Sequence, residues 1–447
     1  MNSIQSIVRT LPAACIRLLA CSAVCASAWA SPSDQSERPA PDSALTLVDV
    51  LDYAHAFAPS VRAADAAYES QRETAGHIGA WPDPVLSYVY FVEPIQTRVG
   101  PQRQRFSLKQ TVPWFGTTGA RKESARAKAQ ALQEGVRATW LGVSLSVRRA
   151  YATYYYLVRE ISLTRESADL LRLWESVVRS RYRASLASHP DVMRTEIELA
   201  RLTDRLRALE DRLDVAAERV RAEAGLSADQ PLADPVLPAT QSLNWPRDSL
   251  IVWARAVSPD LVAGRFELES RDASVRVATR SSVPNLTLGV DYYDIGTPDQ
   301  PVPSGGTDAW AVGVSLNLPL WIGKNGSRND DARADYRRSE YELEDMQRQL
   351  EASIHEAVFE YTDALARLRL YRDALVPKAS QSLGATYSAY QGGQANFLDL
   401  LQSQRELLAL QLEEQRAHVD AFVGLARTEA LVGRDLHTTE SGDQHAN

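Results

Sequence analysis

The feature that most constrains the fold of this chain is a duplication, because one set of landmark residues occurs twice, about 200 residues apart. The matched pairs, at offsets that rise only from 200 to 208, are Pro59 and Pro259, Pro84 and Pro284, Gly116 and Gly323, Ala150 and Ala357, Tyr154 and Tyr361, Tyr182 and Tyr390, Asp191 and Asp399, and Gly225 and Gly433. A steady period of this kind is typical of repeated structural units, so the sequence predicts two copies of one architecture.

The predicted domain boundaries follow from this duplication. The first repeat covers 45–225 and the second covers 248–433, each reading as helix, two strands, a very long helix, a turn and a further helix. The segment 226–247 contains four prolines and is predicted to be a linker. Residues 31–44 and 434–447 are predicted to be disordered ends.

Each repeat contains an unusually long helical run. The run from Ser124 to Arg183 has no proline, and its roughly 60 residues would extend roughly 90 Å. A comparable run from Asn329 to Tyr390 contains Pro377 near its end. Its apolar positions follow an eleven-residue repeat, which predicts a nearly straight helix without the left-handed supercoil of a heptad.

Four segments change to the period of two that is typical of strands, at about 84–94, 103–114, 284–293 and 308–321. The last alternates small or polar residues with an apolar face formed by Trp310, Val312, Val314, Leu316, Leu318 and Leu320. The expected fold class is therefore mainly α with a small β part, built from duplicated helix–hairpin–long helix–helix units.

The first 30 residues have the layout of a secretory signal, with two arginines, an apolar run and an Ala-Trp-Ala end. We expect cleavage after Ala30, and the alternative is lipidation at Cys21. All three cysteines lie in this segment, so no disulfide or thiolate metal site is expected in the exported chain. A net charge of −8 argues against nucleic acid as a partner.

The strands decide between a soluble periplasmic protein and one that enters the outer membrane. Aromatic residues flank them, as in the girdles of membrane barrels, at Trp81, Trp114, Phe115, Trp310 and Trp321. Val312, Val314 and Leu316 would then face lipid. Four strands cannot close a barrel and an open edge is not tolerated in lipid, so several copies must combine, and three copies would give twelve strands.

Two motifs resemble the outer membrane factor family, the TolC-like outer membrane efflux proteins. The segment 110–116, Gln-Thr-Val-Pro-Trp-Phe-Gly, is similar to the exit from strand to helix in that family. The segment 390–401, which contains Gly392, Gly393 and Asp399, resembles the helix–turn–helix signature at the periplasmic tip.

The resemblance implies a homotrimer with a twelve-stranded β-barrel on a long α-helical periplasmic barrel, in the outer membrane of a Gram-negative bacterium. It implies docking of the tip onto a periplasmic adaptor that is coupled to an inner-membrane transporter. The function implied is passive efflux of solutes such as metal ions or drugs, with some likeness to the heavy-metal branch, while protein secretion stays open as a cargo class.

Several tip residues acquire expected roles through the resemblance. The entrance gate would involve Tyr390 and Asp399 and, in the first repeat, Tyr182 and Asp191. The family's second acidic and basic gate positions are Gln402 and Ala395 here, so the closing network is only partly present. The adaptor-docking tip would comprise Gly392, Gly393, Gln394, Arg183 and Ser185.

Simpler interpretations accompany these roles. Asp399 follows Asn396 at the spacing of a helix capping box, and Asp191 follows Ser188 in the same way. Gly392 and Gly393 would let the backbone turn, and Tyr390 could pack in a core.

No cofactor, metal site or catalytic group is expected. The seven histidines are dispersed, and no phosphate loop or nucleophile motif occurs. The chain is therefore interpreted as a non-enzyme. The alternative function is a soluble periplasmic coiled-coil adaptor or scaffold, and an exported hydrolase is disfavoured.

Overall fold

The computed structural model describes residues 44–239, 245–300 and 302–436. The predicted signal segment 1–30 and the alternative lipid site Cys21 lie outside the described residues. The same holds for 31–43 and 437–447, the larger parts of the two predicted disordered ends.

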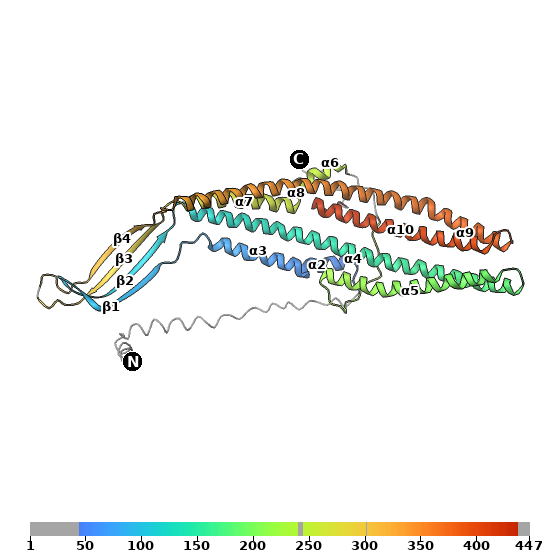
Figure 1. Cartoon of the computed structure of the whole chain (residues 1–447), viewed down its shortest axis with the longest axis horizontal. Coiled ribbons are helices and arrows are strands. Elements are labelled where there is room, and N and C mark those ends of the chain that lie inside the picture. Colours follow the sequence, from blue (N-terminus) through green and yellow to red (C-terminus); the bar gives the residue numbers. More distant parts are fainter. Residues whose placement is uncertain (1–43, 240–244, 301, 437–447) are drawn as a thin grey trace, which may run out of the picture. The chain divides into compact units, whose positions relative to one another are not determined.

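Two repeats of helices and strands make up the unit that begins at Ser43 (Figure 1). The first contains α2 (Leu47–Phe57), α3 (Pro59–His77), β1 (Val85–Thr97), β2 (Gly100–Val112), α4 (Thr117–Arg183) and α5 (His189–Ala224). The second contains α6 (Arg247–Val257), α7 (Pro259–Arg280), β3 (Leu286–Ile295), β4 (Ala309–Leu316), α8 (Ile322–Leu370), η3 (Tyr371–Leu375), α9 (Val376–Gln391) and α10 (Phe397–Val432). The mainly α class with a small β part is confirmed.

The long helix of the first repeat, α4, has 67 residues and so extends about 100 Å. It begins after Gly116, whose φ of 76° turns the chain out of the strand. Its counterpart in the second repeat is continuous from α8 through η3 to α9. Among the described residues, no helix combines the length and the apolar character needed to cross a bilayer.

The short π-helix η3 explains why the offset between the repeats rises from 207 to 208 along the long helix. A π turn holds one more residue than an α turn, so a single inserted residue is absorbed without rotating the rest of the helix. The wider turn also lies directly before Pro377, whose ring and missing N–H would disturb a regular α-helix.

Two glycines join helices end to end. Gly225 ends α5 with φ 73°, and a Cβ built there would lie 2.9 Å from the Cδ atom of Pro59 in α3. Gly433 ends α10 with φ 74°, with its Cβ position 3.1 Å from Cδ of Pro259 in α7. The glycines and prolines that mark the duplication are thus in contact, Gly225 with Pro59 and Gly433 with Pro259, where the end of one helix meets the start of another. Glycine is required there because it adopts a positive φ readily and has no Cβ to collide with the proline ring.

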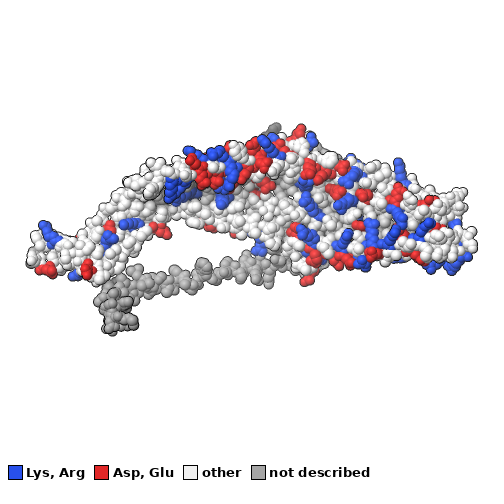
Figure 2. All heavy atoms as spheres, in the orientation of Figure 1, with Lys and Arg blue, Asp and Glu red and all other residues white. Residues whose placement is uncertain are grey.

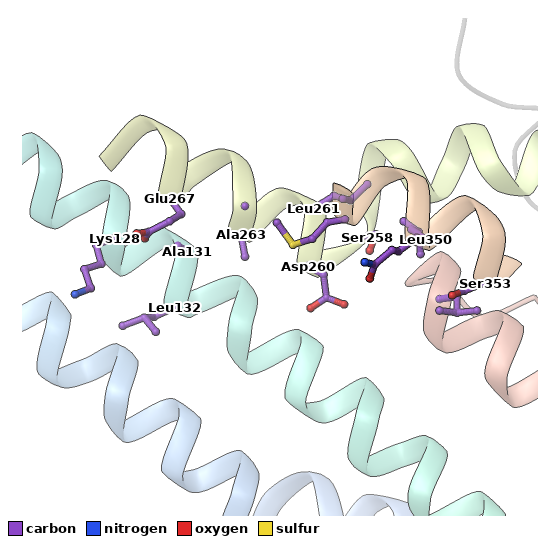
Figure 3. A pocket seen from close by; sticks show the side chains of 14 residues that line it. Lys128, Ala131, Leu132, Ser258, Asp260, Leu261, Ala263, Glu267, Leu350 and Ser353 are labelled. Carbon is purple, nitrogen blue, oxygen red and sulfur yellow. The ribbon is translucent and has the colours of Figure 1, made fainter. Parts of the chain in front are cut away.

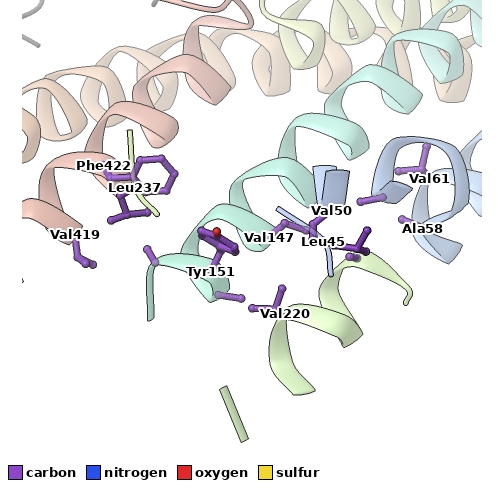
Figure 4. Close-up of a cluster of buried hydrophobic side chains, with 14 residues drawn as sticks. Leu45, Val50, Ala58, Val61, Val147, Tyr151, Val220, Leu237, Val419 and Phe422 are labelled. Carbon is purple, nitrogen blue, oxygen red and sulfur yellow. The ribbon is translucent and has the colours of Figure 1, made fainter. Parts of the chain in front are cut away.

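The largest apolar core surrounds the first of these joints (Figure 4). Val147 and Tyr151 of α4 pack there with Val220 of α5, Phe422 of α10 and Leu237 of the linker. The Tyr151 hydroxyl accepts a hydrogen bond from the backbone N–H of Val236 at 3.3 Å. The proline-rich linker is therefore held against the helices through this core.

The four strands form one antiparallel sheet in the order β1-β2-β3-β4. The central pairing joins the two repeats, with Phe106 opposite Tyr292. β4 ends at Leu316, five residues before the predicted limit of 321. Pro319 has no N–H for a ladder, which accounts for the shorter strand.

Candidate functional site

The sheet sorts its side chains into one apolar and one polar face. Strand pairing aligns Leu86, Leu108, Val290 and Val312 in one row across all four strands. Alternate residues along each strand continue this face, which also contains Val112, Leu286, Leu288, Val314 and Leu316. Gln110 is a polar exception within this face, and its amide donates to the carbonyls of Pro82 at 2.8 Å and Thr111 at 2.9 Å.

A row of four aromatic rings crosses the apolar face near its outer limit. The ring of Tyr88 lies 5.0 Å from that of Phe106, Phe106 lies 6.2 Å from Tyr292, and Tyr292 lies 5.0 Å from Trp310. The predicted Trp310 is thus one member of a continuous row. The other three are separated by up to about 200 residues in sequence, so only the strand register brings them together.

The opposite face is mostly small or polar, with Val85, Val89 and Tyr293 as its larger apolar or aromatic members. Its rows place Ser87, Ser107, Asp291 and Ala311 together, and beside them Val85, Lys109, Gly289 and Gly313. No helix within the described residues packs on either face, and β4 is exposed along its whole length. An ordinary soluble sheet buries at least one apolar face, so this sheet lacks the cover that the soluble interpretation requires.

The apolar surface continues to the helix end of the sheet. Trp81, Trp114, Phe115 and Trp321 are exposed there, and Trp114 and Phe115 contact edge to face at 5.9 Å. Val312 keeps 81% of its surface exposed. On the face shown in Figure 2, charged side chains cover the helices, whereas few lie over the strands.

The second candidate site is the pair of turns at the other end of the helices. In the first, Leu186 N–H donates to Arg181 O at 2.8 Å and Ser185 N–H to Tyr182 O at 2.9 Å. In the second, Gln394 N–H donates to Ala389 O at 2.8 Å and Gly393 N–H to Tyr390 O at 3.1 Å. Both helices therefore end in the same hydrogen-bonding motif, at positions that differ by 208.

The two candidate gate carboxylates both form capping boxes. Asp399 Oδ2 accepts from Asn396 N–H at 3.3 Å while Asp399 N–H donates to Asn396 Oδ1 at 2.9 Å. Asp191 Oδ2 accepts from the Ser188 N–H at 3.2 Å and from its hydroxyl at 2.6 Å. The capping role that the sequence offered as the simpler interpretation is thus present at both positions.

Tyr390 is buried where the two hairpins α4–α5 and α9–α10 meet. Its ring packs against Phe397 at 5.8 Å, and the guanidinium of Arg181 lies 4.8 Å above it. Arg181 Nη1 also donates to the carbonyl oxygen of Tyr390 at 3.1 Å. Burial raises the pKa of Tyr390, with Arg181 opposing and Asp191 adding to the rise, so the phenol stays neutral.

Arg181 is a residue that the sequence reasoning missed. It precedes Tyr182 by one position, and the only signal for it was the internal repeat, which places Ala389 at the equivalent position. The predicted Tyr182 is exposed and contacts His189 edge to face at 5.6 Å, so the two tip tyrosines have different surroundings. Arg183, Gly392 and Gln394 are exposed at the turns.

Ser185 has φ 59°, the left-handed conformation that Gly393 adopts at φ 73° in the other turn. We expect Ser185→Gly to stabilise the first turn by about 1 kcal/mol, because glycine has no Cβ to be crowded there. The reverse change, Gly393→Ala, should destabilise the second turn by a similar amount. Thermal unfolding of the purified protein in detergent measures both, and a lower midpoint for Ser185→Gly would contradict the backbone argument.

A groove of about 510 Å³ lies beside the joint of α10 and α7 (Figure 3). Leu132, Leu261 and Leu350 supply much of its lining, and Asp260 is a carboxylate within it. The residues that line the groove come mostly from facing sides of four packed helices, α4, α7, α8 and α10. Within the described residues, no group of three or more His, Cys, Asp or Glu side chains is placed to hold a metal ion.

Comparison with known proteins shows which proteins this chain resembles in sequence and in fold. Residues 250–433, the second repeat, match the profile of the family described as "Outer membrane efflux protein". The chain is 24% identical to Protein CyaE of Bordetella pertussis over 87% of this chain and 82% of CyaE. It is 26% identical to the toluene efflux pump outer membrane protein TtgF of Pseudomonas putida, over 68% of this chain and 63% of TtgF.

The fold is shared with the outer membrane protein VceC of Vibrio cholerae, with a TM-score of 0.74 and 20% identity. The alignment covers 87% of this chain and 96% of VceC. The second repeat thus matches the outer membrane efflux protein family, and the whole chain is similar in sequence to CyaE and in fold to VceC, in line with the two motifs of the sequence. The comparisons give no support to the soluble scaffold.

Proposed function

We propose that this protein is one subunit of a homotrimeric outer-membrane duct, which conducts solutes passively out of a Gram-negative cell. The observation that carries the proposal is the sheet with an exposed, continuous apolar face, on which none of the described helices packs from either side. In lipid, such a face needs no protein cover, and the small and polar face can line water.

The dimensions of the apolar surface support a membrane location. From Phe106 to Trp114 the chain advances eight residues, and at about 3.4 Å each with a tilt of about 40° the height is about 20 Å. Outer-membrane barrels have an apolar band about 25 Å tall between aromatic girdles. The row ending at Trp310 and the group of Trp114, Phe115 and Trp321 would occupy the two girdles.

The edges of the sheet support assembly. β1 and β4 each have one strand neighbour within the described residues, so each leaves a ladder of backbone groups to be paired. Because unpaired backbone groups are not tolerated in lipid, β1 of one copy would pair with β4 of the next. Three copies give twelve strands, above the minimum of about eight for a membrane barrel.

The tip would receive a periplasmic adaptor coupled to an inner-membrane transporter. Exposed groups at the two turns, among them Arg183, Ser185, Gly392, Gly393 and Gln394, are available for this contact. The duct itself would perform no chemistry. The name of the relative TtgF gives toluene as the exported compound of its pump. For this chain, the resemblance of its sequence motifs favours metal ions as the exported class.

Asp399 is proposed to narrow the entrance in addition to capping α10. In this interpretation Asp399→Ala raises single-channel conductance in planar bilayers, or reduces block by divalent cations, because three carboxylates leave the pore. Asp49→Ala is the matched control, since Asp49 forms the same kind of capping box with Thr46 at the start of α2, away from the tip, and its loss has a similar cost of about 1 kcal/mol. If Asp399→Ala changed neither the conductance nor the block by divalent cations, helix capping would be the only role of Asp399.

Cell fractionation tests the proposed function directly. The full-length protein should be recovered with outer membranes, require detergent for extraction, and form ion-conducting channels in planar bilayers of known lipid composition. Recovery in the soluble periplasmic fraction, without channel activity, would reject the duct.

A further inference from the structure

Among the paired residues on the polar face of the sheet, basic side chains outnumber acidic ones. Arg105 and Lys109 lie on this face of β2, and Asp291 lies on β3, opposite Ser107. Two cations and one carboxylate give the face a net charge of +1, whereas the whole sequence has a net charge of −8. The charge of this face is therefore opposite in sign to that of the chain, and it does not follow from overall composition.

Two carboxylates near the end of the sheet that is remote from the helices lie on its other side. Asp294 follows Tyr292 by two positions on β3 and pairs with Gln104, so it belongs to the apolar face. Asp308 accepts hydrogen bonds from the Tyr292 hydroxyl and, at 3.0 Å, from the N–H of Ile295. Neither carboxylate therefore offsets the cations of the polar face.

The two cations of the polar face are not neutralised by ion pairs. Within the described part of the chain, none of the ion pairs involves Arg105, Lys109 or Asp291. Lys109 is exposed, and its neighbours in the same row on β3 and β4 are Gly289 and Gly313, which have no side chain to cover it. The charges of both long side chains thus remain available to a solute in front of this face.

Two polar groups beside these cations have no hydrogen-bond partner among the described residues. Ser107 lies between Arg105 and Lys109 on the same face of β2, and it is only 2% exposed, with its Oγ unpaired. The Nε of Arg105 is also buried and unpaired. Buried polar groups are normally hydrogen-bonded, so each unpaired group requires an explanation. Both groups can donate, and an oxyanion held between Arg105 and Lys109 would be an acceptor for both.

We propose that the lumen of the barrel prefers anions, and that Arg105, Ser107 and Lys109 form a subsite for small oxyanions and organic carboxylates on its inner wall. The proposal rests on the proposed duct, in which the polar face lines water. Three chains would place six cations and three carboxylates there, a net charge of +3. Rings of arginine and lysine are typical of anion pores, and a low-dielectric wall concentrates the field of such rings in the lumen.

The expected consequence is a cargo of anionic solutes. A positive lumen raises the local concentration of anions and lowers that of free cations. This preference runs against the metal ions that the sequence motifs favour. Salt screens the field, since the Debye length falls from about 10 Å at an ionic strength of about 0.1 M to about 3 Å at about 1 M. The preference for anions is therefore expected to be strongest in dilute salt.

Reversal potentials across planar bilayers of neutral lipid, in a gradient of dilute KCl, measure this preference on the full-length protein. Arg105→Gln combined with Lys109→Gln changes the net charge of the proposed lumen from +3 to −3 and should lower the chloride-to-potassium permeability ratio by about fivefold or more. Asp291→Asn should raise the ratio by about twofold. Arg98→Gln, which removes an exposed cation from the turn between β1 and β2, is the matched control and should change the ratio by less than about twofold.

The outcomes separate the preference for anions from the duct itself. If the double variant forms channels whose permeability ratio differs from that of the wild type no more than the ratio of Arg98→Gln does, the preference is wrong and the duct stands. If the wild-type protein forms no channels, the duct is rejected and the preference with it. The exchange of Arg105→Lys with Lys109→Arg keeps the charge and should keep the wild-type ratio, so a loss there would show that charge is not the cause.

A variant that adds a charge covers the case in which the double variant does not assemble. Gly313 lies in the row of Lys109, and a Cβ built on Gly313 would meet no atom within 4 Å, so a larger side chain fits. Gly313→Glu should lower the chloride-to-potassium permeability ratio by about threefold, with Gly313→Gln as the neutral control. Equal ratios for these two variants would contradict the assignment of this face to the lumen.

Block of the KCl current by added pyrophosphate tests the subsite. Ser107→Ala keeps both cations but removes the unpaired hydroxyl, and it should weaken the block by about threefold. Ser87→Ala is the matched control, because Ser87 lies opposite Ser107 on β1 and removal of its hydroxyl should leave the block unchanged. Equal block in these two variants would show that Ser107 takes no part in binding and would overturn the subsite.

Discussion

Replacement of Val312 by arginine should abolish stable insertion of this protein into the outer membrane. Val312 lies in the middle of β4 on the apolar face and is 81% exposed in the single chain. An arginine facing lipid near the bilayer midplane costs about 2–4 kcal/mol, and the proposed trimer would carry three of them. The measurement is the amount of heat-resistant oligomer in isolated outer membranes.

Ala311→Arg is the matched control, since it adds the same side chain one residue away on the opposite face. There the guanidinium would enter the water-filled interior beside Asp291 and should be tolerated. Equal loss for both variants would indicate a general defect of the strand. Wild-type levels of oligomer for Val312→Arg would contradict the assignment of this face to lipid.

Tyr390→Ala should strongly destabilise the tip, by about 3–5 kcal/mol, because it removes a large buried ring from the cluster around Phe397. It also removes the aromatic ring over which the guanidinium of Arg181 lies. The result would be measured as a lower unfolding midpoint in detergent and as faster proteolysis at the turn 392–396.

Tyr390→Phe is the informative companion. Within the described residues the buried Tyr390 hydroxyl has no hydrogen-bond partner, so its removal should be neutral or slightly stabilising. A loss of stability for Tyr390→Phe comparable to that of Tyr390→Ala would show that the hydroxyl is bonded across the assembly, and would contradict a purely packing role.

Much of the architecture could be predicted from local patterns. The scarcity of proline in the long runs and the alternation around Val312 are local patterns, so both are visible without a structure. The Gly225 and Gly433 landmarks were recognised as a repeat, but their role as joints against Pro59 and Pro259 depends on contacts between distant segments.

The tip was harder to predict because its contacts are long-range. The capping boxes of Asp191 and Asp399 are local and were anticipated from spacing alone. The hydrogen bond from Arg181 to the carbonyl oxygen of Tyr390 joins residues 209 positions apart, and no local sequence pattern around Arg181 predicts it. The same holds for the aromatic row, since strand register decides which rings meet.

In the proposed assembly, three chains close one barrel wall by pairing the edges of their sheets. Native mass measurement of the full-length protein, released from detergent micelles, tests it most directly. We expect an assembly of three chains that persists in detergent and is lost when a proline introduced in β1 or β4 blocks edge pairing. A single chain that stays dispersed in water without detergent would contradict it.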